Sequence, residues 1–339
     1  IMLIFIRLIT IYLLIINFVS NHPLYNIHDK NDIREMLYDA GIDWKSLTLF
    51  HQNNTDIGFK RKKSEAAPSG KPLGYINFNI VNKSFLFSGY INAKFMKNYY
   101  VFSSPLLYSK NRADHFSNLV YDYRQKSGIG FVNDWVIIQI GKGNESWGAG
   151  QNIQLALNKQ SKTYDYFLLG SDYRKIRVRY IHGYLESIEK NINRYITARG
   201  FEWSNHKSVV IGISEVVIYS GENRSIDIGY MNPISSHLEV ELNDRLNILG
   251  NSNSNAVWQI HFDYLLLKNL RMSLNFLIDE FVIDRDIQKG KEHGKALSFR
   301  FAYSPSLKSN GLLTFHSSLV YVGTPTFRHK LGSNNFVHN

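Results

Sequence analysis

The stretch WQIHFDYLLLKNLRMSLNFLI, residues 258–278, decides the fold class. Large apolar residues occupy every second position from Trp258 to Leu266 and again from Leu270 to Ile278, with polar residues between them. A period of two is the signature of a β-strand with one apolar and one polar face. Lys268–Asn269 interrupts the pattern as a turn would. The stretch therefore predicts two antiparallel strands joined by a tight turn.

The same alternation recurs along most of the chain. It is clearest in residues 76–80, 85–95, 176–180, 297–303 and 313–321, and turn signals such as Lys289–Gly290, His293–Gly294 and Ser309–Asn310–Gly311 lie between runs. The runs are about 8–11 residues long, which is the length of a tilted membrane strand. Strands of soluble proteins average about five to six residues.

Periodicity alone fits two folds. In a soluble sandwich the apolar faces would meet in a dry core, whereas in a membrane barrel they would face lipid around a wet lumen. The many long strands favour an all-β fold, a large antiparallel transmembrane β-barrel. Residues 73–339 divided by about 15–18 residues per strand and turn give roughly 15–18 strands. Arg177 and Arg179 must then line the lumen, because an Arg facing lipid at mid-membrane costs roughly 2–4 kcal/mol.

Composition excludes several classes of protein. The 339 residues include 21 Phe, 21 Tyr and 5 Trp, far too many for a disordered chain. With no cysteine there is no disulfide scaffold and no iron–sulfur cluster. The net charge of +11 invites a nucleic-acid partner, but only Phe59–Lys63 clusters basic residues and no nucleic-acid motif occurs. We therefore expect no nucleic acid; an acidic polysaccharide or lipopolysaccharide suits diffuse positive charge equally well.

The N-terminal region predicts export. Residues 1–20 combine Arg7 with an apolar run, as in a signal peptide; an uncleaved anchor or a buried helix is the alternative. Residues 21–72 are predicted to be a periplasmic helix and linker, with the helix at Asp29–Gly41, Asp32 as its N-cap and Glu35 in the capping box. Residues 73–339 form the predicted outer-membrane barrel. Residues 331–339 resemble a loop leading into further strands, which suggests C-terminal truncation.

One glycine-rich motif stands out, IGKGNESWGAGQNIQLAL at residues 140–157. It lacks the GK[ST] pair and the following helix of a phosphate loop. Glycines this dense after a strand instead favour a close-packed turn or an inward-folded loop. Trp147 in such a loop is either a sugar-stacking residue or simply a packing residue. The motif comprises Gly141, Gly143, Gly148 and Gly150 around Glu145 and Trp147.

These residues resemble the capsule assembly proteins of the Wzi family. The stretch from residue 140 to 169 carries the resemblance, and it continues in order through RYIHGYLES (179–187), RYITARGFEW (194–203), VIGISEVVIYSG (210–221), IGYMNPISSHLEVE (228–241) and NFLIDEFVID (275–284). It covers residues 128–284 well. The resemblance implies an outer-membrane barrel with a small periplasmic helical element, which holds capsular or extracellular polysaccharide by lectin-like binding without catalysis or a cofactor.

We expect polysaccharide contacts from aromatic and charged residues. The candidates are Glu145, Trp147, Tyr164, Tyr166, Arg177, Arg179, His182 and Arg199. His182 more readily suits a hydrogen-bonded lumen or turn residue than a metal ligand, so no metal is expected. Charged residues such as Arg199 and Glu215 are alternatively partners of one another inside the lumen. Asn232–Pro233 predicts a turn, and Asp279 and Glu280 predict strand-end ion pairing.

Two rival functions remain open at this point. A general or substrate-specific porin has the same fold but requires an open lumen with a charged constriction. An outer-membrane esterase or phospholipase requires an oriented Ser–His pair; His316–Ser317 and His115/Ser117 supply the residue types, but no G-x-S-x-G motif occurs. We therefore predict a non-enzymatic, monomeric outer-membrane protein with polysaccharide and outer-membrane lipid as its partners.

Overall fold

The computed structural model describes residues 35–42, 44–52, 73–81, 84–96, 98–104, 106–108, 126–159, 161–188, 191–236, 254–279, 294–305, 313–329 and 332–336. The predicted signal peptide, the linker at residues 53–72, the N-cap Asp32, His115, Ser117 and Glu280 lie outside these ranges. Of the predicted N-terminal helix, residues 35–39 are described and are helical. Within the described ranges, no helix has the length and apolar character needed to cross a membrane.

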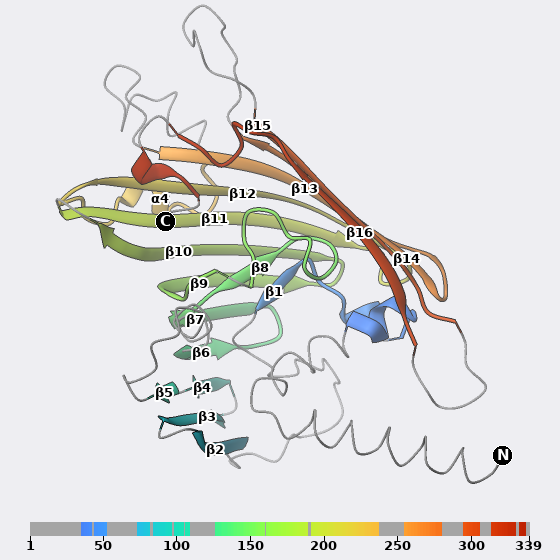
Figure 1. The fold of residues 1–339 in the computed structure, drawn as a ribbon, viewed down its shortest axis with the longest axis horizontal. Coiled ribbons are helices and arrows are strands. Elements are labelled where there is room, and N and C mark those ends of the chain that lie inside the picture. The colour runs from blue at the N-terminus through green and yellow to red at the C-terminus, as the bar shows by residue number, and fades with distance from the viewer. Residues whose placement is uncertain are drawn as a thin grey trace, which may run out of the picture.

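A single antiparallel sheet of fourteen strands dominates the structure (Figure 1). Its strands are β2 (Leu73–Val81), β3 (Ser84–Phe95), β4 (Tyr99–Ser104), β5 (Leu106–Tyr108), β6 (Lys126–Val132), β7 (Val136–Gly143), β9 (Tyr164–Tyr173), β10 (Ile176–Ile188), β11 (Ile192–Ser204), β12 (Val209–Glu222), β13 (Ser254–Leu267), β14 (Leu270–Asp279), β15 (Gly294–Tyr303) and β16 (Phe315–Val322). Neighbours in sequence are neighbours in space, except that β8 is skipped and β5 pairs with β3. Among the described strands, β16 and β2 are the two ends of the sheet.

A second, two-stranded sheet lies against one face of the large one. It pairs β1 (Phe50–Gln52) with β8 (Glu145–Trp147), so that Phe50 lies opposite Trp147. The short helix η1 (Trp44–Ser46) precedes β1 in the chain. In Figure 1 the large sheet curves past β1, β8 and the blue N-terminal turn. We call the face that contacts β1 and β8 the inner face, and the opposite one the outer face.

The two faces have opposite chemistry. On β14, the inner residues Arg271, Ser273 and Asn275 are completely buried and alternate with partly exposed apolar residues. On the outer face, Ile213 of β12 is 55% exposed and Ile260 of β13 is 52% exposed. A water-soluble sandwich would bury the apolar face and expose the polar one. The inner face also has an apolar part, where residues such as Ile181, Val216 and Leu277 form the main core with Phe50 and Trp147. Exposed apolar residues on the outer face are what the wall of a transmembrane β-barrel requires, because that face meets lipid.

The predicted fold class is therefore confirmed, and the alternating runs used to predict it lie in strands of the sheet, except that Leu313 and Thr314 precede β16. The fourteen described strands of that sheet fall just below the predicted range of fifteen to eighteen. Short connections at 174–175, 205–208 and 268–269 gather at one end of the strands, which we call the turn end. At the opposite end, which we call the loop end, β12 ends at Glu222 and β13 begins at Ser254, and β14 ends at Asp279 and β15 begins at Gly294.

Candidate functional site

The glycine-rich motif forms an inward-folded loop, as predicted. After β7 the chain turns onto the inner face, and Trp147 forms an isolated bridge with Leu157. Gly148 (φ +142°) and Gly150 (φ +68°) adopt backbone conformations that other residues rarely reach. Asn275 of β14 holds the loop from the wall, because its Oδ1 accepts from Ala149 N at 2.7 Å and its Nδ2 donates to Ala149 O at 2.9 Å.

Trp147 is a packing residue in this loop. Its side chain is completely buried and meets the ring of Phe50 edge-on, with centroids 4.8 Å apart. Gly200 of β11 makes room for the pair, since a Cβ there would lie 2.4 Å from a ring carbon of Phe50. The expectation that Trp147 presents its face to a sugar is therefore corrected: close packing against the wall occupies the ring on both sides.

Tyr164 and Tyr166 are buried beneath the same loop and likewise cannot stack on a surface sugar. The Tyr166 hydroxyl accepts from the Gln139 amide, and the amide oxygen accepts from the Tyr100 hydroxyl at 2.6 Å. Gly141 and Gly143 lie nearby at the end of β7, where they pair with Tyr166 and Tyr164 in register. A Cβ on Gly141 would lie 2.2 Å from Ser127 O, so only glycine fits this approach.

Glu145 is the one buried carboxylic acid of this loop. Burial raises the pKa of Glu145 to about 8, while nearby Trp147 and the positive charge of Arg179 partly oppose that rise. Arg179 lies on the inner face of β10 and pairs with Asp172 at 2.5 Å. Glu145 thus keeps its proton through the neutral range, and its carboxyl group is sealed inside the protein.

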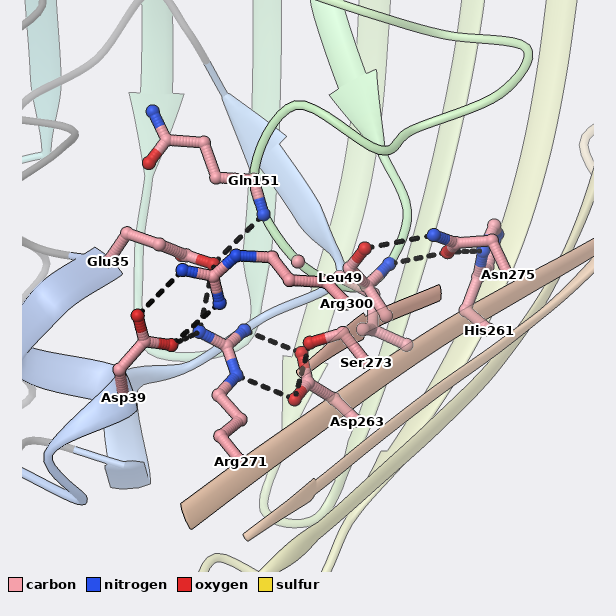
Figure 2. Close-up of polar contacts among 12 residues, drawn as sticks. Glu35, Asp39, Leu49, Gln151, His261, Asp263, Arg271, Ser273, Asn275 and Arg300 are labelled. Atoms are coloured by element: carbon pink, nitrogen blue, oxygen red, sulfur yellow. Dashed lines mark hydrogen bonds and ion pairs between the residues drawn. The ribbon is translucent and has the colours of Figure 1, made fainter. Parts of the chain in front are cut away.

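A second segment, the N-terminal residues 35–52, is bound to the inner face by charge. Figure 2 shows Arg271 and Arg300 pointing from the wall toward Glu35 and Asp39 of the helical turn. Arg271 donates to both carboxylate oxygens of Asp263 at 2.7 and 2.6 Å, to Glu35 at 2.9 Å and to Asp39 at 3.1 Å. Arg300 forms a two-pronged pair with Asp39 at 2.8 and 2.7 Å.

This cluster was not predicted, and it changes the expected role of Glu35. Glu35 Oε1 accepts from Arg271 and from the backbone N of Gln151, each at 2.9 Å, so Glu35 has partners far outside its own helix. The N-terminal turn, the inward loop and the wall therefore meet at one carboxylate. The only sequence signal was that Asp263 and Arg271 occupy polar positions of their strands.

Arg177 and Glu202 hold the same N-terminal segment at residues 47–49. Arg177 pairs with Glu202 of β11 and donates to Leu47 O at 2.8 Å. Glu202 also accepts from Leu49 N at 2.6 Å and Thr48 Oγ1 at 2.9 Å. The prediction that Arg177 and Arg179 face the interior is confirmed, but both already have protein partners there.

A third segment, residues 323–329 and 332–336, lies along the loop end of the inner face. Its first part is held by Asp279 of β14, whose carboxylate accepts from Phe327 N. Its short helix η3 (Gly332–Asn334) contacts β11 and β12: Arg194 donates to Ser333 O at 2.6 Å, and Ser220 donates to Asn334 Oδ1 at 2.6 Å. Asp279 thus binds a backbone amide at the strand end, and the predicted ion pairing of Asp279 and Glu280 stays a prediction.

His182, Arg199 and Glu215 lie on the outer face, which corrects their predicted place in the lumen. Arg199 is opposite Tyr180 and Glu215 in register and pairs with Glu215 at 2.7 Å. His182 contacts the hydroxyls of Tyr180 at 3.2 Å and Tyr219 at 2.9 Å, so both ring nitrogens face protein groups. The segment that covers these residues includes Asn232, which forms the predicted turn by accepting from Ile234 N at 3.0 Å, with Pro233 between them.

The inner face is thus occupied by three segments. It also holds a Ser–His pair oriented by a third side chain: Ser214 Oγ lies 2.8 Å from His261 Nε2, and His261 Nδ1 lies 2.9 Å from Asn275 Oδ1. All three side chains are buried. His316 and Ser317 are adjacent on β16, so their side chains point to opposite faces. Within the described ranges, no group of three His, Cys, Asp or Glu side chains has a metal-binding arrangement.

Comparisons with known proteins give only distant likenesses. No protein-family model matches the chain, and no curated protein matches it. Among solved structures, OccK10 (OpdN) of Pseudomonas aeruginosa is 10% identical, with 74% of this chain and 72% of that chain covered and a TM-score of 0.38. OccK8 (OprE) of the same organism is 11% identical over 73% and 70%, with a TM-score of 0.39. OmpT, an outer membrane protein of Vibrio cholerae, is 8% identical over 78% and 83%, with a TM-score of 0.36. Likenesses this distant carry no argument about the function of this chain.

Proposed function

We propose that this protein is a plugged outer-membrane β-barrel that binds capsular or extracellular polysaccharide at its loop end and helps to retain it at the cell surface. The observation that carries the proposal is the filling of the inner face by three protein segments. The sequence resemblance to capsule assembly proteins of the Wzi family motivates the choice of polysaccharide. The proposal concerns retention, without catalysis.

The membrane location follows from the inverted faces of the sheet. Side chains such as Ile213 and Ile260 are exposed on the outer face, while Arg271 and Asn275 are completely buried on the inner one. Only a surrounding hydrocarbon phase makes that distribution favourable. Membrane barrels have short turns on the periplasmic side and longer extracellular loops, so the turn end is periplasmic and the loop end extracellular.

The filled interior argues against a general porin. A porin needs a water-filled path lined by charged residues that ions and solutes can reach. Here Arg177, Arg179 and Arg271 all face inward but are engaged by Glu202, Asp172 and Asp263. Charges paired in this way hold protein segments together and do not form a solute-accessible constriction.

The loop end is where an acidic glycan would be bound. Lys162, Lys295 and Arg328 are exposed at that end, on the inward loop, on β15 and on the third inner segment, respectively. Cationic side chains form charge-assisted hydrogen bonds with uronate or phosphate groups of polysaccharides. Three such side chains on separate segments would bind one long polymer at several points, which strengthens retention through effective concentration.

A polysaccharide-retention assay tests this role. In a capsulated strain lacking the native protein, we expect wild type to restore cell-bound polysaccharide, and K162A/K295A/R328A to release most of it into the medium. The matched control is K175A/K207A/K268A, which removes three exposed lysines from the turn end. Equal retention by both triple variants would refute the proposed glycan site.

Planar-bilayer recordings separate the porin alternative. We expect purified wild-type protein to give no large steady conductance, because the three inner segments block the path. Large steady channels from correctly folded protein would favour diffusion over retention and overturn the proposal.

A further inference from the structure

A fourth segment, residues 223–236, packs on the outer face of the wall. It follows β12 and contains the short helix α4 (Ile228–Met231). The strand residues beneath it are Tyr180, Tyr195, Thr197, Arg199 and Tyr219. In the strand pairing, these residues share a face with Phe201 and Ile213, which are exposed on the outer side.

On the side that faces the wall, backbone carbonyl oxygens of this segment accept hydrogen bonds from polar side chains of the strands. Tyr230 O accepts from Tyr180 Oη at 3.0 Å and Arg199 Nη2 at 3.1 Å, and Asn232 O accepts from Arg199 Nε at 3.1 Å. The ring of Tyr230 stacks on Tyr219 with centroids 4.4 Å apart and an interplanar angle of 11°. Arg224 O accepts from Tyr195 Oη at 2.9 Å. These contacts fix the segment against β10, β11 and β12.

The other side of the segment is apolar and exposed. Ile228 is 82% exposed and Ile234 89% exposed, and Ile226 and Met231 are also exposed. Its charged residues Arg224 and Asp227 pair with each other at 3.0 Å, so they do not add an unpaired charge to that surface. The segment therefore presents polar atoms to the wall, and its exposed side carries four apolar side chains beside Asn223, Ser225 and Asn232.

We propose that residues 223–236 form a strap that lies in the outer leaflet and binds lipid acyl chains through Ile226, Ile228, Met231 and Ile234. These four side chains are continuous with the apolar outer face. The strap starts at the loop end of β12, where the wall meets the outer leaflet. The strap also replaces lipid above Arg199, Glu215 and His182, whose polar groups hydrocarbon could not satisfy. This inference rests on the proposed membrane location.

Single-cysteine labelling tests the strap, because the chain has no cysteine of its own. I228C and I234C are each labelled with an environment-sensitive fluorophore and reconstituted in phosphatidylcholine vesicles, with or without lipids brominated in mid-chain. I213C on the wall is the lipid-exposed control, and K207C at the turn end is the aqueous control. We expect the strap labels to emit at the blue-shifted wavelength of I213C and to be quenched by brominated lipid, not by iodide.

Three results would overturn the inference in different ways. Strap labels that match K207C and are quenched by iodide would place the segment in water. Blue-shifted labels that neither quencher reaches would indicate a protein occupant, such as a second copy of the chain. If brominated lipid fails to quench I213C, the membrane location is contradicted, and the proposed function with it. If brominated lipid quenches I213C but neither strap label, only the strap is refuted.

Discussion

Removing the Arg271 side chain is predicted to destabilise the protein severely and to release its N-terminal segment. Arg271 is completely buried and contacts three carboxylates, of which Asp263 receives two hydrogen bonds from it. In R271M, Asp263 keeps only a weak contact from Ser273 at 3.3 Å, while Glu35 and Asp39 keep Arg300. Breaking a buried ion pair from one side costs about 3–5 kcal/mol. We expect a loss of about that size in the free energy of unfolding.

Urea unfolding in lipid micelles, followed by tryptophan fluorescence, measures this loss. Trp44 of the N-terminal segment lies 5.7 Å from the Arg271 guanidinium, so its emission should shift to longer wavelength when the segment detaches. R271K is the conservative control: it keeps the charge but loses the two-pronged fit to Asp263, and we expect an intermediate loss.

A double-mutant cycle with D263N isolates the pair itself. Because R271M/D263N removes both members, it should be less destabilised than the sum of the single variants. Additive losses, or an R271M protein within about 1 kcal/mol of wild type, would refute the view that this cluster holds the N-terminal segment on the wall.

Three further changes probe the inward loop by urea unfolding. G200A should lose about 1–3 kcal/mol through overpacking of the space beneath Phe50, whereas G332A, where a Cβ meets nothing within 4 Å, should leave stability unchanged. Burial raises the pKa of Glu145 to about 8 in the folded protein, above the ordinary value of 4.5. Its contribution to wild-type stability is therefore full below pH 4.5 and is lost as the pH rises through 8; E145Q should not show this loss. N275L leaves the backbone N and O of Ala149 without their partner. The free energy of unfolding should fall by about 1–3 kcal/mol for each group that stays unsatisfied. An unchanged midpoint would contradict the anchoring role of Asn275.

The positions of the strands could be predicted from the sequence because alternation is a local property. Most apolar residues in 258–278 mark the outer face, with Leu265 and Leu277 as exceptions, and a period of two predicts a strand. That the glycine-rich motif forms a tight or inward-folded loop could also be predicted, since Gly148 and Gly150 occupy backbone conformations that favour glycine. What the loop packs against was not, because Asn275 lies 126 residues away from Ala149 in the chain.

The ion pairs that Arg271 and Arg300 form with the N-terminal segment also could not be predicted, because their partners are even further apart in the chain. Glu35 is separated by 236 residues from Arg271, and nothing in a helical capping pattern distinguishes a local cap from a distant ion pair. Burial of Trp147 was equally hidden, because a Trp beside glycines suits both a sugar-stacking surface and a packed loop. In both cases the residue types were informative, but the partner depended on the curvature of the whole sheet.

The misplacement of Arg199 was avoidable, and it explains why the strap exists. In RYITARGFEW, Arg199 shares its parity with Phe201 and Trp203, so strict alternation already assigns it to the outer face. An Arg exposed to lipid at mid-membrane costs about 2–4 kcal/mol, the cost from which an inward position was predicted only for Arg177 and Arg179. The structure meets the same constraint differently. Glu215 pairs with the Arg199 charge, and the carbonyl oxygens of Tyr230 and Asn232 accept from Arg199 Nη2 and Nε, respectively. A polar cluster on the lipid-facing side of a barrel therefore requires a cover whose own outer surface is apolar, and residues 223–236 have that character.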